Sequence, residues 1–390
     1  MFKLLDCNNF WSPSGGGVRR YHLEKIEYYK DRMDVEYVFV MHDKETFTEQ
    51  IGENAFIEHL RVPKVMGNWE YRYLVKSGPI EPIILKHNPD VIEVGSPYFM
   101  PGIIHKIVRK NRLDSKVFGF WHADFPITYV GRFLTGSPLQ SMGEKVAWRK
   151  ARKDYNRMDG VLVSSQTIMD RMQENGMHNL NFAPLGVNEE LFHPDQRNDA
   201  LREKLQAGDS NRLILFFPHR FSKEKGLHIL LKAYEILTRI MDVAPALVLA
   251  GTGPYEHLVT EAVAKYDHVH FQGFIRSKEE MAEYYASSDL GFALSSWETF
   301  GLSLVEALSA GLPLISAGAG AAREHIEKSD AGFILEEVKP QSLADAVVTF
   351  SKMEDLKLRE KARAYASTLS WENCFDRQLD IYSSAISNKK

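Results

Sequence analysis

Two cations in the second half of the chain lie where a strand should lead into a helix. Arg220 and Lys225 occupy a loop between an apolar run at 213–217 and a helical pattern at 227–240. An arginine holds anionic oxygens with two parallel hydrogen bonds, and a lysine adds a point charge. The pair therefore predicts an anion site, whereas two unrelated, solvated side chains are the alternative.

Two glutamates, Glu298 and Glu306, lie eight positions apart on either side of another predicted strand-to-helix turn. Ionised carboxylates accept hydrogen bonds from hydroxyl groups. The two side chains could therefore hold two parts of one polyhydroxylated ligand. The alternative is an acid at a helix start followed by an ordinary surface glutamate.

The first half of the chain offers two weaker signals. Gly16 and Gly17 belong to a glycine run that follows the first predicted strand and precedes a helix starting near Val18. Glycines let backbone N–H groups approach an anion, and a helix N-terminus attracts negative charge. A plain tight turn is the alternative. The run lacks the spacing of a dinucleotide site.

His122 follows an apolar run at 117–121 and begins the sequence His122-Ala123-Asp124-Phe125-Pro126. A histidine at a strand end could donate a hydrogen bond to a ligand or transfer a proton. A structural role in the loop is equally compatible with the sequence.

Short apolar runs alternate with longer amphipathic stretches and must position these side chains. The runs lie at 35–40, 91–94, 117–121, 160–163, 213–217, 246–250, 290–294 and 313–316. This alternation indicates parallel sheets with helices on both faces. The pattern restarts after a turn at 184–188. We therefore predict two doubly wound α/β domains, 1–185 and 186–371, with ligands at the carboxyl ends of the strands.

Composition limits the classes of protein that remain. The 390 residues are 44% hydrophobic and 26% charged, as in globular proteins. The chain has only two cysteines, Cys7 and Cys374, and they have no metal-ligand spacing. A disulfide framework and a structural zinc site are therefore both disfavoured, and the reducing cytoplasm fits best. The sequence offers no signal peptide or membrane-spanning run. A net charge of −4 gives no nucleic-acid signature.

Charge is nevertheless uneven along the chain. Residues 106–157 hold twelve Lys and Arg against four Asp and Glu, a balance of +8. A helix predicted at 142–158 carries many of these cations beside an apolar stripe of Trp148, Ala151, Tyr155 and Met158. The block could make weak contact with an anionic membrane, or it could be a solvated helix face.

Taken together, the motifs resemble the retaining GT-B glycosyltransferases of family 4, or glycosyl transferases group 1, of the bacterial polysaccharide and glycolipid type. The motifs are Gly15-Gly16-Gly17-Val18, His122-x-Asp124-x-Pro126, 184–194, Arg220-x-x-x-Glu224-Lys225-Gly226, Ala250-Gly251-Thr252-Gly253-Pro254, Gln272-Gly273-Phe274, Glu298 to Glu306, 307–315 and Ser370-Trp371-Glu372. The resemblance covers nearly the whole chain and is looser at 43–87.

The resemblance implies a GT-B fold, in which two Rossmann-like domains face each other across a cleft. Residues 1–185 would bind the acceptor and residues 186–371 the nucleotide-sugar donor, with a last helix at 372–390 packed back onto the first domain. The implied donor site holds Arg220 and Lys225 at the diphosphate, Glu306 at the ribose, Glu298, Phe300, Gly301, Leu302 and Ser303 at the sugar and phosphates, and Phe274 and Ile275 at the base. Gly16 and Gly17 would meet phosphate or acceptor, and His122 the transferred sugar.

The implied reaction moves a hexose from a nucleoside-diphosphate sugar to a polysaccharide or lipid-linked sugar, with an α-linkage. UDP-glucose is the favoured donor and GDP-mannose the next. The resemblance implies no metal and no cofactor. The expected place is the cytoplasm, with weak peripheral contact at the inner face of the plasma membrane. Two alternatives are a non-hydrolysing UDP-sugar epimerase and a catalytically silent scaffold. The combination of Arg220, Lys225, Glu298 and Glu306 disfavours the scaffold.

Overall fold

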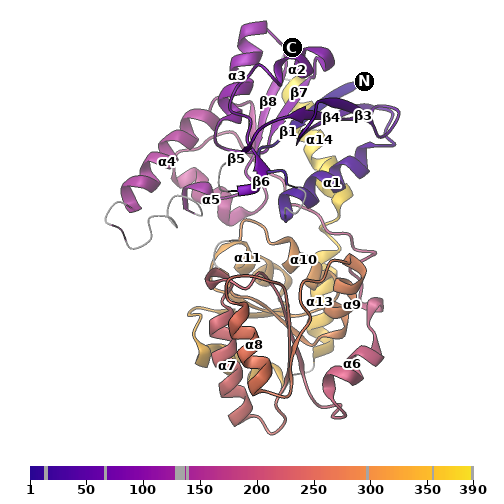
Figure 1. Ribbon diagram of the computed structural model, residues 1–390, viewed down its shortest axis with the longest axis vertical. Coiled ribbons are helices and arrows are strands. Elements are labelled where there is room, and N and C mark those ends of the chain that lie inside the picture. Colours follow the sequence, from indigo (N-terminus) through magenta and orange to yellow (C-terminus); the bar gives the residue numbers. More distant parts are fainter. Residues whose placement is uncertain are drawn as a thin grey trace. The chain divides into compact units, whose positions relative to one another are not determined.

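The computed structural model describes residues 1–12, 16–65, 68–127, 137, 140–295, 298–353 and 355–387 (Figure 1). The chain divides into two compact units. Unit 1 comprises Met1–Leu185 with Trp371–Lys390, and unit 2 comprises Gly186–Ser370. The first division lies at the position predicted from the sequence. The second lies one residue earlier than predicted, because the Trp371 ring stacks on Phe375 in unit 1 with 5.5 Å between ring centroids.

Unit 1 is built on an eight-stranded sheet with the order β10-β9-β8-β7-β1-β2-β4-β3. The strands are β1 (Phe2–Cys7), β2 (Val35–Asp43), β3 (Phe47–Gln50), β4 (Ala55–Arg61), β7 (Val91–Val94), β8 (Lys116–Phe120), β9 (Gly160–Val163) and β10 (Leu180–Phe182). Neighbours pair in parallel except for β3 and β4. A separate hairpin joins β5 (Lys64–Val65) to β6 (Asn68–Arg72).

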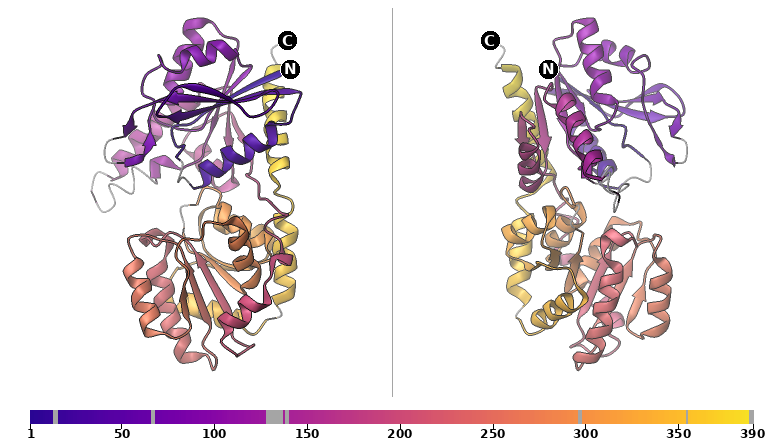
Figure 2. Two further views of the ribbon diagram at one scale, coloured as in Figure 1. Left: turned by 45° about the vertical axis from the view of Figure 1, so that its right-hand side comes forward. Right: turned by 90° about the vertical axis from the view of Figure 1, so that its left-hand side faces the viewer.

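Helices cover both faces of this sheet. One face packs against α2 (Glu81–His87), α3 (Met100–Asn111), α4 (Gln140–Tyr155) and α5 (Gln166–Glu174). The other carries α1 (Gly17–Tyr29) and α14 (Trp371–Ser387), which lie side by side (Figure 2). Because side chains alternate along a strand, Leu5 and Cys7 belong to the first core and Leu4 and Asp6 point to the opposite face.

A buried polar cluster anchors α14 to the rest of unit 1. Lys25 Nζ of α1 lies 3.0 Å from an Asp6 carboxylate oxygen and 2.9 Å from a Glu93 carboxylate oxygen. The Tyr382 hydroxyl of α14 donates a hydrogen bond to the same Glu93 carboxylate. Buried charges are costly unless they are paired and hydrogen-bonded. The C-terminal helix therefore completes the polar core of unit 1.

Unit 2 is built on six parallel strands with the order β13-β12-β11-β14-β15-β16. They are β11 (Ile214–Pro218), β12 (Ala246–Ala250), β13 (Val269–Phe271), β14 (Leu290–Ala293), β15 (Leu314–Ala317) and β16 (Gly332–Leu335). The order of the strands reverses between β11 and β14. In open sheets of this kind, ligands bind beside the carboxyl ends of the strands at such a switch point.

The helices of unit 2 also form two layers. One face packs against α7 (Leu227–Ile240), α8 (Glu256–Lys265) and α12 (Pro340–Phe350). The other carries α6 (Asp199–Gln206), α9 (Lys278–Ser287), α10 (Leu302–Ser309) and α13 (Asp355–Ala366). Near these lie α11 (Gly320–Ser329) and the short 3₁₀ turn η2 (Pro194–Gln196), whereas a second 3₁₀ turn, η3 (Lys223–Lys225), leads into α7. Phe216 of β11 stacks on Tyr284 of α9 with 5.4 Å between centroids, on the face opposite α7.

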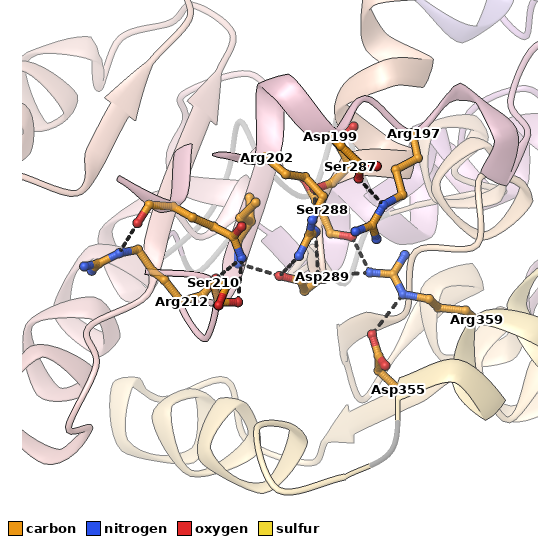
Figure 3. Close-up of polar contacts among 12 residues, drawn as sticks. Arg197, Asp199, Arg202, Ser210, Arg212, Ser287, Ser288, Asp289, Asp355 and Arg359 are labelled. Carbon is orange, nitrogen blue, oxygen red and sulfur yellow. Dashed lines mark hydrogen bonds and ion pairs between the residues drawn. The ribbon is translucent and has the colours of Figure 1, made fainter. Parts of the chain in front are cut away.

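Asp289 ties several elements together at the amino end of β14 (Figure 3). Its carboxylate accepts hydrogen bonds from the Ile214 backbone N–H at 2.8 Å, from Arg202 at 2.7 Å and from Arg359 at 3.1 Å. These bonds fix α6 and α13 against the edge of the sheet opposite the carboxyl ends. This polar cluster is therefore structural, and the candidate site lies at the opposite edge of the sheet, beside the carboxyl ends of the strands.

Candidate functional site

Lys225 and Glu298 meet at the carboxyl end of the unit 2 sheet, beside the switch point. Lys225 ends η3 after β11, and Glu298 follows β14. Their side chains form a close ion pair and are 25% and 21% exposed. Burial alone would raise the pKa of the Glu298 carboxyl, but the charge and hydrogen bond of Lys225 outweigh burial and hold this pKa below its usual value. The glutamate is therefore ionised at neutral pH.

His219 lies directly after β11 and supports the same loop. Its Nε2 atom donates to the Phe292 carbonyl of β14 at 2.7 Å. Burial, with a smaller effect of Lys225, lowers the pKa of His219 to about 4. The ring is therefore neutral at pH 7. His219 is not among the site residues predicted from the sequence, although its place directly before Arg220 after a strand was a usable signal.

The loops after β11, β12 and β13 are held side by side by close backbone contacts. The Gly251 N–H donates to the Gly273 carbonyl at 2.7 Å. A Cβ atom on Gly251, whose φ is 139°, would lie 2.1 Å from the His219 carbonyl oxygen, so only glycine fits there. The predicted base-binding segment at Phe274 is therefore joined through Gly251 to the loop that carries Arg220.

The exposed fractions of these side chains differ in a way that matters for binding. Phe274 is 64% exposed, and its neighbour Ile275 is only 8% exposed. The Arg220 side chain is exposed and forms no hydrogen bond or ion pair with any residue that the structure describes. An exposed aromatic ring and an uncompensated guanidinium on adjoining loops can contact a base and an anion.

The second half of the site is the start of α10. Gly301, in the left-handed conformation with a φ of 84°, caps this helix. Leu302 and Ser303 form its first turn and are half-buried, whereas Phe300 is buried. Backbone N–H groups in a first helical turn lack intrahelical acceptors and attract anions. The turn is therefore a second source of positive potential beside Lys225.

His325 of α11 fixes the loop that precedes α10. Its Nε2 atom donates to the Phe300 carbonyl at 2.7 Å, and its Nδ1 atom accepts from the Tyr365 hydroxyl at 2.8 Å. Burial lowers the pKa of His325 to about 4, so the ring is neutral. The Ala321 N–H also donates to the Glu298 carbonyl at 3.2 Å. Nothing in the sequence distinguishes a helical histidine of this kind, and His325 was missed.

Glu306 lies in the middle of α10, about one turn after its start, as predicted. Its side chain is only 5% exposed. A carboxylate so deeply buried is not an ordinary solvated surface glutamate. The observation removes that alternative, and the predicted role of Glu306 at a ribose stays a prediction.

The predicted residues of unit 1 also gather at the carboxyl ends of strands. Gly16 caps α1, which begins at Gly17, and a Cβ atom on Gly16 would meet no atom within 4 Å. His122 follows β8, stacks on Phe120 at 4.1 Å and meets Tyr21 of α1 edge-on at 4.8 Å. Burial lowers the pKa of His122 to about 4. A neutral His122 can exchange hydrogen bonds but carries no charge at pH 7. Gly15 lies outside the described residues.

Within the described ranges, no group of three or more His, Cys, Asp or Glu side chains is placed to hold a metal ion. No helix in the described part of the chain is both long and apolar enough to cross a membrane.

Comparison with protein families then identifies the chain. The Glycosyltransferase Family 4 model matches residues 15–191, and the Glycosyl transferases group 1 model matches residues 198–368. The chain belongs to the group 1 glycosyltransferases. The two matched segments correspond closely to the two units. They confirm the family that the motifs predicted.

Curated relatives resemble the glycosyltransferase over most of its length. A GDP-mannose-dependent alpha-(1-6)-phosphatidylinositol dimannoside mannosyltransferase from Mycobacterium tuberculosis is 25% identical over 393 residues, which cover 95% of this chain and 93% of the relative. A GDP-mannose-dependent alpha-mannosyltransferase from Corynebacterium glutamicum is 26% identical over 338 residues, which cover 85% and 75% of the two chains.

Solved structures confirm the predicted GT-B fold of the glycosyltransferase. Sucrose-phosphate synthase from Thermosynechococcus elongatus superimposes with a TM-score of 0.76 over 99% of both chains, at 16% identity. HepE from Anabaena, solved in complex with UDP, gives a TM-score of 0.74 over 98% of this chain and 100% of its own, at 19% identity.

Proposed function

We propose that the protein is a retaining glycosyltransferase that moves a hexose from a nucleoside-diphosphate sugar to a lipid-linked or polysaccharide acceptor, with an α-linkage. The observation that carries the proposal is the Lys225–Glu298 pair at the switch point of unit 2. In this proposal Lys225 supplies a cation for the diphosphate, and the ionised Glu298 carboxylate beside it accepts hydrogen bonds from sugar hydroxyls. Exposed Arg220 and the first turn of α10 lie on the same edge.

The donor that we favour is GDP-mannose, with UDP-glucose as the second candidate. The motifs alone favour UDP-glucose. The relatives from Mycobacterium tuberculosis and Corynebacterium glutamicum, which cover 95% and 85% of this chain, are both GDP-mannose-dependent by name, and this supports the change of order. A ligand that binds only the native state raises the melting temperature according to its concentration and Kd. A thermal-shift screen of UDP, GDP, ADP and their sugars therefore ranks the donors.

Charge development at the donor determines the role of each group. As the bond between C1 of the sugar and the leaving phosphate oxygen breaks, positive charge builds on the sugar and negative charge on the diphosphate. Arg220, Lys225 and the N–H groups of α10 stabilise the second of these. Fixed dipoles and charges that face a developing charge lower the barrier without reorganisation. We infer that these groups serve in place of a metal ion.

The acceptor oxygen then attacks C1 from the face that the diphosphate leaves. It forms the new C1–O bond and gives its proton to the departing phosphate, so the α-configuration is kept. His122 is neutral and can accept or donate a hydrogen bond to the transferred sugar without adding charge. We assign Glu298 to the sugar and Glu306 to the ribose.

The acceptor that we favour is lipid-linked, and weak contact with an anionic membrane would bring the enzyme to it. The Mycobacterium tuberculosis relative, by its name, acts on a phosphatidylinositol dimannoside. The experiment measures nucleoside diphosphate release from GDP-mannose and UDP-glucose with and without a membrane lipid extract. Release that depends on the extract supports transfer. Isomerised sugar nucleotide without release would show an epimerase, and no reaction with any donor would show a scaffold.

A further inference from the structure

A hollow of about 900 Å³ lies on unit 1 between α3 and the end of α4. Most of its lining comes from α3, and the rest comes from Arg112 and Leu113 after α3, from Asp154 at the end of α4 and from Arg157 in the turn after α4. These segments lead into the amino ends of β8 and β9. The hollow therefore opens near the amino-end edge of the sheet. Gly17 and His122 lie at the opposite edge, beside the carboxyl ends of the strands. The hollow is distinct from the predicted acceptor residues.

Positive charge exceeds negative charge around this hollow. Five Lys and Arg residues and one acid, Asp154, line it. Lys110 is paired with Glu81 at 2.8 Å, and Asp154 is paired with Lys150 of its own helix at 2.6 Å. The four remaining cations form no ion pair with any described residue; they are Lys106, Arg109, Arg112 and Arg157. Like charges gathered without counter-charges are unfavourable, so this arrangement favours an anionic occupant.

His105 adds a polar group to the same hollow. Its Nε2 atom is buried and has no hydrogen-bond partner in the described part of the chain. Burial lowers the pKa of His105, so the ring is neutral at pH 7. Buried polar atoms in native proteins are usually hydrogen-bonded. Because the ring also donates a hydrogen bond to the Asp154 backbone, Nε2 of the neutral ring is an acceptor, and a hydroxyl group of a bound ligand would supply the missing partner.

The outer face of α4 extends the positive surface and adds apolar side chains. Lys145, Arg149, Lys150 and Lys153 are exposed on this helix. Met142 and Val146 are 58% and 63% exposed. The positions 142, 146, 149 and 153 follow helical spacing and lie on one side of the helix. A helix face that mixes basic and exposed apolar residues is typical of surfaces that lie on an anionic membrane interface.

We propose that the hollow and the outer face of α4 form one docking surface for anionic lipid, in which the four cations of the hollow that form no ion pair with a described residue hold a headgroup phosphate. The occupant is a lipid surface because the exposed cations extend over two helices and flank exposed Met142 and Val146. A single soluble anion would neutralise the hollow alone. The inference rests on the membrane contact in the proposed function and gives that contact a place on the molecule.

The test compares two sets of charge reversals in the full chain. The docking variant is Lys106→Glu, Arg109→Glu and Arg157→Glu. The matched control is Lys204→Glu, Lys232→Glu and Lys357→Glu on unit 2, where all three side chains are exposed and none is ion-paired with a described residue. Both variants change the net charge equally. Circular dichroism and the donor-induced thermal shift establish that each is folded. The set Lys106→Gln, Arg109→Gln and Arg157→Gln replaces the docking variant if it does not fold.

Co-sedimentation is measured with vesicles of phosphatidylcholine alone and of phosphatidylcholine mixed with phosphatidylglycerol, at low and high salt. We expect wild type and control to bind the anionic vesicles only, and salt to weaken this binding. We expect the docking variant to bind about tenfold more weakly or worse. Equal binding of docking variant and control would overturn the proposal. So would calorimetric binding of inorganic phosphate that depends on the three residues but is not matched by any vesicle binding.

Turnover with a short, soluble acceptor separates this inference from the proposed function. The docking variant is expected to keep wild-type turnover, because the hollow lies at the opposite edge of the unit 1 sheet from the predicted acceptor residues and contains none of the predicted donor residues. Vesicle binding without turnover on any donor would contradict the proposed function alone. Loss of turnover in the docking variant with unchanged vesicle binding would contradict the docking surface alone.

Discussion

Lys225 and Glu298 are 73 positions apart in the chain, yet they form one ion pair between the loops that follow β11 and β14. The sequence assigned one to the diphosphate and the other to the sugar. The structure couples them, since each side chain determines the charge that the other faces. Their contributions to binding and turnover should therefore not be additive.

The two predicted phosphate ligands should behave differently when removed. Arg220→Ala and Lys225→Ala each delete charge-assisted hydrogen bonds worth about 1.5–3 kcal/mol, so turnover should fall about tenfold to a hundredfold. Only Lys225→Ala also leaves the Glu298 carboxylate unpaired, so only this variant should lower the melting temperature without ligand. Steady-state kinetics and thermal unfolding check both statements. Lys223→Ala, in the same 3₁₀ turn but exposed and without an ion pair to any described residue, is the control. Equal kinetics in all three variants would show that the diphosphate binds elsewhere.

The two glutamates should divide between binding and chemistry. Glu306 is buried within α10, and contact with the ribose does not change during the reaction. An interaction that is equal in ground and transition states affects binding and not turnover. Glu306→Gln should therefore mainly raise the donor KM, and Glu298→Gln should mainly lower kcat. The free nucleoside diphosphate should bind Glu306→Gln more weakly than wild type. If calorimetry shows that Glu298→Gln weakens binding of the free nucleoside diphosphate equally, the two glutamates do not have separate roles in binding and chemistry.

The buried cluster around Lys25 should be essential for stability. Lys25→Met leaves Asp6 and Glu93 buried without a cation, and breaking a buried ion pair in this way costs about 3–5 kcal/mol. Urea unfolding should show this loss. Lys30→Met, which breaks only a surface pair with Glu27, should leave stability nearly unchanged. A Lys25→Met protein as stable as wild type would mean that the cluster does not anchor α14.

Chelation of metal ions should leave turnover intact. Arg220, Lys225 and the first turn of α10 can meet the charge of the leaving diphosphate, so the proposed reaction requires no divalent ion. Rates before and after EDTA treatment, and again after Mg²⁺ or Mn²⁺ is added, test this statement. Activity that disappears with EDTA and returns with either ion would contradict it.

The bounds of the elements that position the site were predicted closely from the sequence. The run at 213–217 and the helix at 227–240 correspond to β11 (Ile214–Pro218) and α7 (Leu227–Ile240). Apolar periodicity and the turn residues between the elements are local signals, and they suffice for this purpose. Two sheet strands, a hairpin and α2 lie at 43–87, where the sequence offered no recognisable motif.

Contacts between distant elements could not be predicted in the same way. His325 of α11 donates a hydrogen bond to the carbonyl of Phe300, which lies in the loop before α10. Lys25 pairs with Glu93, which lies 68 positions later in the chain. Neither has a spacing that marks the contact, because the contact is made only when the sheet brings the elements together. The same holds for the pairing of Lys225 with Glu298.

Calorimetric titration with GDP-mannose and with UDP-glucose measures whether Arg220 and Lys225 hold a nucleoside-diphosphate sugar. We expect wild type to bind one of these donors at a single site in unit 2. Binding should persist in Lys223→Ala and be weakened about a hundredfold or more in the Arg220→Ala, Lys225→Ala double variant, since two charge-assisted contacts are lost. Failure of wild type to bind any nucleoside-diphosphate sugar, or unchanged affinity in the double variant, would contradict the account.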